Sequence, residues 1–208
     1  MKTKKKSPKR KPNPQRSRSS YDLVDGRPVI TAITGGIAEG KSTVLRFIAS
    51  MGYSTASADD VARLVFEDGE VNGMLAEIAG MLAPISRSAL RDVLFKDPSA
   101  RRAVNRVMHP RIIDAISQLN VEFVEVPLLI EGCLQGSFDK IWVVTCGLEE
   151  QHARLKARYG ATTDVDAILA MQLPTSAKLP FADLIIRTNR EPQTVSRFVS
   201  EALQVRID

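Results

Sequence analysis

The stretch from Pro28 to Ser50, PVITAITGGIAEGKSTVLRFIAS, constrains this chain most strongly. An apolar, β-favouring run leads into a glycine turn, and the turn leads into apolar residues at helical spacing. Within the turn, Gly35 to Ser42 read G-x-x-x-x-G-K-S, the spacing of a phosphate-binding loop. Glycines let successive backbone N–H groups point inward, and the following helix adds its positive end. The stretch therefore predicts a strand, a polyphosphate-binding loop and a helix.

The residues of this loop have distinct predicted tasks. Lys41 is expected to reach the β- and γ-phosphates of a bound nucleotide, and Ser42 to ligate Mg²⁺. The predicted nucleotide-binding residues are Gly35, Gly36, Ala38, Glu39, Gly40, Lys41, Ser42 and Thr43. The alternative is a glycine-rich turn that binds no ligand.

Charge is unevenly distributed along the 208 residues. Nine of the 29 Lys and Arg residues, and none of the 24 Asp and Glu residues, lie in residues 1–20. The remainder has 20 basic and 24 acidic residues, a net charge of −4. Because residues 1–25 are also rich in Pro and Ser, we expect a disordered basic tail. Contact between this tail and nucleic acid or an anionic surface is the alternative.

The rest of the composition favours a cytoplasmic protein with one sizeable core. The chain is 44% hydrophobic, and no apolar run approaches the roughly 20 residues that span a bilayer. Cys133 and Cys146 lack metal-ligand spacing, so we expect reduced, buried, apolar cysteines.

Strands alternate with helices along most of the chain. We expect strands at 29–34, 53–57, 121–126, 139–146 and 183–187. This alternation predicts a parallel, five-stranded, three-layer α/β fold. Residues 70–119 are instead helical in pattern and unusually basic, which favours an inserted subdomain for an anionic substrate. A solvated charged face is the alternative for most of these arginines.

Two acidic residues follow strands beside the phosphate loop. Asp59 is expected at the carboxyl edge of the sheet, where ligands of open α/β sheets bind. Its carboxylate suits either a base for an attacking hydroxyl or a helix cap. Glu125 ends another strand, where a second Mg²⁺ contact, usually through water, is expected.

A helix predicted from Glu149 to Tyr159 carries Arg154 and Arg158 on one face. Two guanidinium groups directed at one point suit a phosphoryl group during transfer. A second helix, predicted over 164–173, completes a helical hairpin.

From Val29 to the C-terminus the chain resembles the dephospho-coenzyme A kinase family. The most discriminating motifs are VPLLIE at 126–131 and the pair His109-Pro110. The other matching motifs are TGGIAEGKST, ADDVAR, SALRDVLF, QHARLKAR and Ala182-Asp183.

The resemblance implies a three-layer P-loop kinase fold with a helical substrate-binding insertion and a small helical lid. The nucleotide-binding core is expected at 26–69, 120–148 and 181–208, the insertion at 70–119 and the lid at 149–180. The implied reaction moves the ATP γ-phosphate to the ribose 3′-hydroxyl of dephospho-CoA, the last step of coenzyme A biosynthesis. ATP, dephospho-CoA and Mg²⁺ are the implied ligands. We expect a monomer or weak homo-oligomer without a membrane partner.

The resemblance also implies roles for individual residues. Asp59 matches the family's general base, and with it the predicted catalytic set is Asp59, Lys41, Arg154 and Arg158. The residues that match substrate-side motifs are His109, Pro110, Leu128 and Glu131. The predicted metal contacts are Ser42 and Glu125.

The chain departs from the family pattern at a few positions. Ser57 replaces the first Asp of a D-A-D segment, and Glu125 replaces an Asp. Ala38 and Glu39 replace Gly and Ser inside the phosphate loop. Because a carboxylate facing the phosphates would repel them, we expect Glu39 to point to solvent. The changes at Ser57, Ala38 and Glu39 leave open a degenerate kinase domain that acts as a binding protein. Because many kinases share the phosphate loop, another small-molecule or nucleotide kinase of the same fold is the second alternative.

We expect a variant that lacks residues 1–20 to keep wild-type kinase turnover, because the tail is predicted to be solvated and separate from the core. Steady-state assays of the full-length and shortened chains check this. If the tail binds nucleic acid instead, binding will weaken steeply with salt and disappear on deletion.

Overall fold

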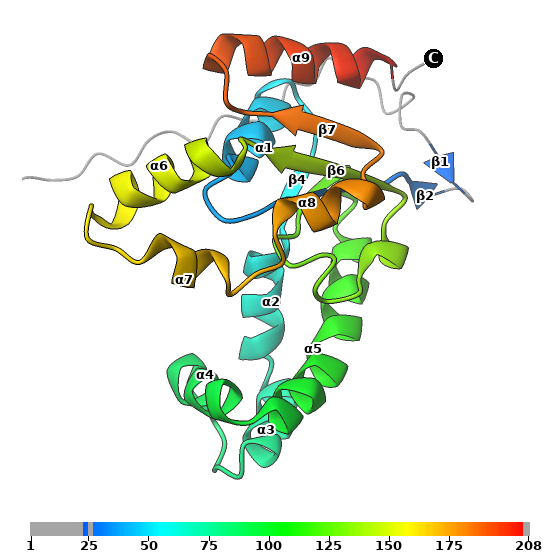
Figure 1. The fold of residues 1–208 in the computed structure, drawn as a ribbon. Helices are drawn as coiled ribbons and strands as arrows, with labels where there is room; N and C mark the ends of the chain where they lie inside the picture. Colours follow the sequence, from blue (N-terminus) through cyan, green and yellow to red (C-terminus); the bar gives the residue numbers. More distant parts are fainter. Residues whose placement is uncertain (1–22, 25–26, 206–208) are drawn as a thin grey trace, which may run out of the picture.

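The computed structural model describes residues 23–24 and 27–205 and is built around a five-stranded parallel sheet (Figure 1). The strands lie side by side in the order β4-β5-β3-β6-β7. Their bounds are Thr31–Thr34 for β3, Thr55–Ser57 for β4, Phe123–Glu125 for β5, Lys140–Thr145 for β6 and Leu184–Arg187 for β7. The predicted fold class is therefore confirmed, with strands slightly shorter than expected.

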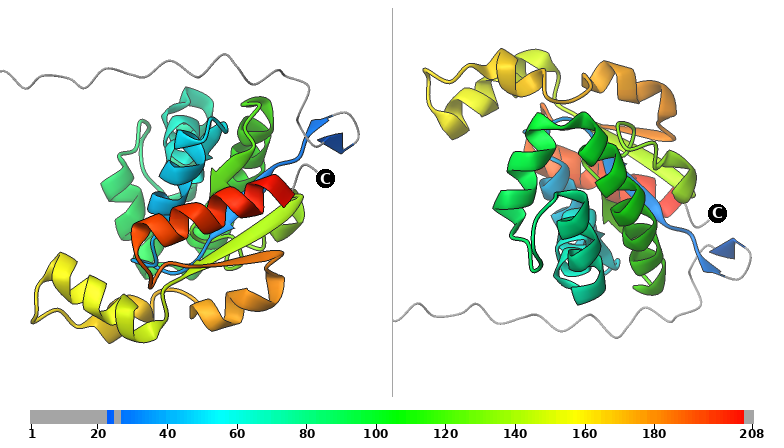
Figure 2. Two further views of the ribbon diagram at one scale, coloured as in Figure 1. Left: turned by 90° about the horizontal axis from the view of Figure 1, so that it is seen from above. Right: turned by 90° about the horizontal axis from the view of Figure 1, so that it is seen from below.

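Helices cover both faces of the sheet and complete three layers. Helices α1 (Lys41–Ser50) and α9 (Pro192–Val205) pack on one face, and α2 (Ala58–Glu67) and α5 (Pro98–Gln118) on the other. Figure 2 shows α9 across the sheet in the view from above and α5 in the view from below. Both layers are held by apolar side chains, as expected for a sheet buried on both faces.

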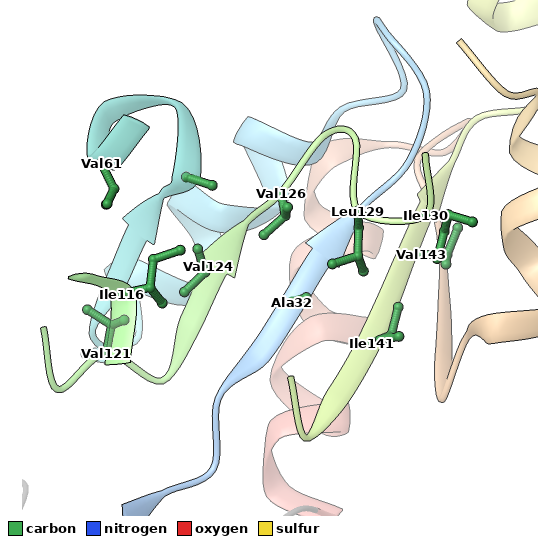
Figure 3. Packing of buried hydrophobic residues seen from close by; sticks show 11 residues of the cluster. Ala32, Val61, Ile116, Val121, Val124, Val126, Leu129, Ile130, Ile141 and Val143 are labelled. Carbon is green, nitrogen blue, oxygen red and sulfur yellow. The ribbon is translucent and has the colours of Figure 1, made fainter. Parts of the chain in front are cut away.

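Consecutive residues of β5 show how one strand serves both layers. Phe123 is fully buried against Tyr53 and Trp142 on the α1 and α9 side. Val124 points to the opposite face, into the cluster with Val61 and Val143 (Figure 3). Trp142 is itself buried, so its ring serves the packing of this face.

The strand order creates a crevice at the carboxyl edge of the sheet. From the central β3 the chain runs outward to β4, returns to β5 and then crosses to β6 and β7 on the other side. Ligands of open α/β sheets bind where the strand order reverses in this way. Ser57 is in register with Glu125, and Glu125 with Ile33, so the ends of three strands meet beside the loop that follows β3.

Helices α3 (Gly69–Ile78) and α4 (Arg87–Lys96) pack with α5 beyond the sheet, at the bottom of Figure 1. They share a separate apolar cluster that includes Leu75, Leu90 and Val104. Asp68, Ser86 and Asp97 cap the three helices through side-chain oxygens. The basic block at 70–119 is thus a helical unit with its own core.

The prediction of a second lid helix over 164–173 is correct at its start and wrong at its end, because the helix stops at Leu169. The predicted lid region contains α6 (Leu148–Tyr159), α7 (Val165–Leu169) and α8 (Thr175–Lys178). Pro174 disfavours helical backbone at the residue before it, and the chain turns between α7 and α8. Residues 172–178 form a separate segment that returns the chain from the lid to the core.

The remaining elements are short. Strands β1 (Leu23–Val24) and β2 (Arg27–Pro28) form an antiparallel ribbon, so two residues of the predicted tail are paired and the rest of it lies outside the described residues. Single turns of 3₁₀ helix, η2 (Gln135–Ser137) and η3 (Leu179–Phe181), precede β6 and β7. Within the described ranges, no helix has both the length and the apolar character to cross a membrane.

Replacing Phe123 with Ala should lower the free energy of unfolding by about 3–5 kcal/mol, because it removes a fully buried ring between two aromatic neighbours. Denaturant unfolding measures the loss. Phe198→Ala, at a ring that is 42% exposed on α9, is the matched control and should cost far less. Equal losses would contradict this assignment of the core.

Candidate active site

A cavity of about 620 Å³ opens at the carboxyl edge of the sheet, beside the glycine loop between β3 and α1. The predicted catalytic and metal-binding residues line it together: Lys41, Ser42, Asp59, Glu125, Arg154 and Arg158. They come from α1, α2, β5 and α6, so residues up to 117 positions apart in the sequence share one cavity. Thr188, Arg190, Pro192 and Val195 line its other side.

The loop backbone depends on close approach and on left-handed conformations. A Cβ atom on Gly36 would lie 2.7 Å from Gln151 Nε2, so a side chain there would displace the lid contact. Gly40 precedes α1 with φ of 94°, which suits glycine. Ala38 also has positive φ, 61°, which costs about 1–2 kcal/mol in a residue with a Cβ.

Lys41 is buried, with 8% of its surface exposed. Its Nζ donates to the Gly36 carbonyl oxygen at 2.8 Å, so the ammonium lies against the loop. Burial lowers the pKa of Lys41 below its usual value, the nearby Glu125, Glu39 and Asp59 oppose this shift, and Lys178 adds to it. A cation held among carboxylates at the loop suits an anionic ligand.

Ser42 and Glu125 present oxygen atoms to the same part of the cavity. The Ser42 hydroxyl donates to Glu125 Oε1 at 3.2 Å. A hydroxyl and a carboxylate are ligands that Mg²⁺ accepts, with phosphate oxygens and water completing its shell. Among the described residues no group of three or more His, Cys, Asp and Glu side chains forms a metal cage. The pair therefore fits a Mg²⁺ ion that arrives with a nucleotide.

Asp59 lies in the first turn of α2 and is exposed to the cavity. Ser57, the N-cap residue of α2, makes no side-chain cap bond. No other described residue forms a hydrogen bond or ion pair with the Asp59 carboxylate. The cap alternative therefore lacks support, and this carboxylate is available to a ligand hydroxyl.

The two lid arginines differ in how firmly they are held. Arg154 donates from Nη1 to the Ala38 carbonyl at 3.3 Å and from Nη2 to the Thr188 carbonyl at 2.6 Å. Its Nε also pairs with Glu150 Oε1 at 2.9 Å. Arg158 is exposed and lies over the Tyr159 ring, 5.2 Å from its centroid. Arg154 thus fixes a positive charge against the loop, whereas Arg158 is exposed and contacts the Tyr159 ring.

The prediction that Glu39 points to solvent is wrong. Its side chain is 1% exposed and accepts hydrogen bonds from Gly36 N at 2.6 Å and from the hydroxyls of Thr145 and Thr175. Glu39 lines a second cavity of about 610 Å³ under the lid rather than the first one. The carboxylate therefore avoids repelling a bound phosphate by turning inward, to the opposite side of the loop.

The four predicted substrate-side residues lie outside the lining of the first cavity. His109 and Pro110 are inside α5, which continues to Gln118. Leu128 is 48% exposed. Glu131 forms an ion pair with Lys178, with Oε1 and Nζ 2.6 Å apart. Their predicted contacts with an acceptor stay predictions.

The two cysteines differ from each other. Cys146 is buried, as expected, and burial raises the pKa of its thiol to about 11. Cys133 is exposed, so the expectation of burial is wrong for this residue. It lies in the turn after the 126–131 run and has a positive φ of 54°.

Several polar residues at the loop were not predicted from the sequence. Gln151 donates to the Ile37 carbonyl at 2.8 Å, and Gln172 accepts from Ile37 N at 3.1 Å. The Thr188 hydroxyl donates to the Glu39 carbonyl at 2.6 Å. Single Gln and Thr residues on the lid and at a strand end carry no motif, so only the folded contacts identify them.

A family model described as dephospho-CoA kinase matches residues 29–193. This chain belongs to the dephospho-CoA kinase family. Every predicted site residue lies within the matched range. Members of the dephospho-CoA kinase family are kinases, so ATP is the implied co-substrate.

Individual dephospho-CoA kinases resemble the chain over most of their length. The Gloeobacter violaceus dephospho-CoA kinase is 38% identical over 172 residues, which cover 76% of this chain and 82% of that protein. The Geobacter sulfurreducens enzyme is 33% identical over 188 residues, covering 83% and 95%. The crystal structure of TT1252 from Thermus thermophilus matches with a TM-score of 0.69 and 29% identity, covering 86% of this chain and 97% of that one.

Acidification from pH 7 to pH 5 should destabilise the wild type more than a His109→Gln variant. Burial lowers the pKa of His109, so below the usual value of 6.5 the unfolded chain binds more protons than the folded one. The free energy of unfolding therefore rises with pH through this window. Denaturant unfolding at several pH values checks the slope, and parallel curves for both proteins would contradict it.

Proposed function

We propose that this protein transfers the γ-phosphate of ATP to the ribose 3′-hydroxyl of dephospho-CoA, giving CoA and ADP. One observation carries the proposal: in a chain of the dephospho-CoA kinase family, one cavity unites the phosphate loop, Asp59, Glu125 and the two lid arginines. Phosphoryl transfer needs alignment and charge neutralisation more than covalent chemistry. The cavity offers both.

The phosphate loop binds the ATP phosphates in this proposal. Residues at the start of α1 line the cavity, and the N-terminal end of a helix favours an anion. Lys41 leaves the Gly36 carbonyl for the β- and γ-phosphates, a shift of its flexible side chain over a short distance. Because Lys41 is largely buried, its charge acts on the phosphates with little screening by water.

Ser42 and Glu125 would hold Mg²⁺, with Glu125 acting directly or through a water molecule. The ion, when bound, supplies positive charge to the β- and γ-phosphate oxygens. The chain's own part is to orient it, since β5 and α1 fix the two oxygen ligands at a short mutual distance. Glu125 has one methylene more than Asp and so reaches farther from its strand end.

Asp59 is the general base in this proposal. Its carboxylate accepts a hydrogen bond from the acceptor hydroxyl, orients the oxygen toward the γ-phosphorus and takes the proton as the new bond forms. The position suits this task, because Asp59 lines the same cavity as the loop. Among the described residues, none forms a hydrogen bond or ion pair with its carboxylate.

The lid arginines neutralise charge on the transferring group. Arg154 is already fixed beside the loop, and Arg158 can swing inward when the lid closes over the substrates. Closure would also exclude water, which would otherwise compete with the acceptor hydroxyl. The helical unit of α3, α4 and α5 carries basic side chains that would suit an anionic acceptor.

The decisive experiment is an assay of CoA formation from dephospho-CoA and ATP by the purified protein. A coupled assay of ADP release, run in parallel with nucleoside monophosphates and shikimate, tests the alternative acceptors. Turnover with dephospho-CoA alone supports the proposal. Turnover only with another acceptor, or ATP binding without any transfer, would overturn it.

We expect Asp59→Asn to lower kcat by about 10²-fold or more, because the amide cannot take the proton from the acceptor. ATP affinity should change little, since Asp59 contacts the acceptor side. Asp60→Asn is the matched control: Asp60 is the next residue of α2, pairs with Arg63 and does not line the cavity. Near-wild-type turnover of Asp59→Asn would refute the base assignment.

A further inference from the structure

The segment 172–178, between α7 and the end of α8, contacts both halves of the proposed active site. One set of bonds joins it to the phosphate loop, and another joins it to residues 127–131, inside the VPLLIE run. Helix α6 also contacts the loop, through Gln151 and Arg154, but the contacts of the segment 172–178 reach residues 127–131 as well. The segment therefore links the phosphate loop to the 127–131 run.

At the loop end, the contacts centre on one buried carboxylate. Thr175 Oγ1 donates to Glu39 Oε2 at 2.5 Å and accepts from Gly36 N at 3.1 Å. Gln172 Oε1 accepts from Ile37 N at 3.1 Å. Two successive N–H groups of the phosphate loop are therefore held by the returning segment.

Glu39 also ties the loop to the sheet. Its Oε1 accepts from the Thr145 hydroxyl at 3.1 Å, and Thr145 is the last residue of β6. Its backbone carbonyl accepts from the Thr188 hydroxyl just after β7. A buried carboxylate is costly unless donors surround it, and three donors do so here. Glu39 thus joins the loop, the sheet and the returning segment at one point.

At the other end, Lys178 is fully buried. Its Nζ pairs with Glu131 Oε1 at 2.6 Å and donates to the Pro127 carbonyl at 3.3 Å. Glu131 Oε1 also accepts from Leu173 N at 3.1 Å. Pro127 lines the active-site cavity beside Glu125, so Lys178 holds a wall of that cavity.

We propose that Glu39 is a positioning residue for phosphoryl transfer, which acts through Thr175 and the segment 172–178 to keep the phosphate loop aligned with the 127–131 run. The inference rests on the proposed function and concerns a residue with no direct contact to the phosphates. The alignment matters because a misplacement of about 1 Å between reacting groups can cost 10²-fold in rate.

The position of the carboxylate distinguishes this role from phosphate binding. Glu39 faces the cavity under the lid, whereas the phosphates are proposed to bind in the first cavity. Its bonds to Gly36 N and Thr175 set the curvature of the loop and the place where the lid returns to the core. A change at Glu39 or Thr175 should therefore alter the rate of transfer more than the binding of ATP.

The test uses Thr175→Val, which keeps the shape of the side chain and removes the hydroxyl that bonds the segment to Glu39 and to Gly36 N. Ser176→Ala, at the next and exposed residue of α8, is the matched control. We expect Thr175→Val to lower kcat about tenfold, with the KM for ATP changed less than about threefold. Glu39→Gln provides a second variant that keeps the volume and removes the charge, with the same expected pattern.

Thermal unfolding of each variant separates positioning from stability. If Glu39 and Thr175 serve only the fold, the variants will melt earlier but keep wild-type kcat well below the melting temperature, and the proposal fails. A wild-type protein that makes no CoA would instead overturn the proposed function, while ATP binding by the same protein would still report whether the loop is intact.

A double-mutant cycle tests the link between the two ends. Thr175→Val and Glu131→Gln alter opposite ends of the segment, and we expect the second substitution to lower kcat much less when the first is present. Effects that simply multiply would show that the two ends act independently and would overturn the proposed coupling.

Discussion

The site depends on one constraint, the order β4-β5-β3-β6-β7 of a sheet in which all strands run parallel. The carboxyl ends of parallel strands lie at the same edge of the sheet. A crevice forms there beside β3, because the chain adds strands first on one side of β3 and then on the other. The glycine loop follows β3, Glu125 is the last residue of β5, and Asp59 lies in the first turn of α2 just after β4, so the sheet brings all three to one edge. The lid and the helical unit are then attached around an edge that the sheet already defines.

The phosphate loop carries two buried side chains of opposite charge, one on each of its faces. Lys41 is a buried cation with carboxylates nearby, and Glu39 is a buried anion surrounded by donors. Their separation matters because the loop has a face toward the active-site cavity and a face toward the lid. The positive side chain serves the first face and the negative one the second, so the loop tolerates a carboxylate without repelling a phosphate.

The fold was largely predictable, because its signals are local. The apolar run before Gly35 and the helical spacing after Lys41 each predict their own element, and the alternation along the chain predicts parallel strands. Boundaries were less accurate in the predicted lid, where α7 ends at Leu169, four residues before the predicted end at 173. The exposed position of Cys133, in a turn with positive φ, is likewise not indicated by any local pattern.

The sequence by itself determined which residues can do phosphate chemistry and that they follow strands, since the glycine loop, Asp59 and Glu125 are marked by motif and by spacing. Only the tertiary structure decided where the carboxylate of Glu39 points and what Lys178 holds. Both are buried charges whose partners, Thr145, Thr175 and Glu131, lie between 47 and 136 positions away in the chain. A buried charge is tolerated only where folded neighbours solvate it, and those neighbours exist only after the lid has returned to the sheet.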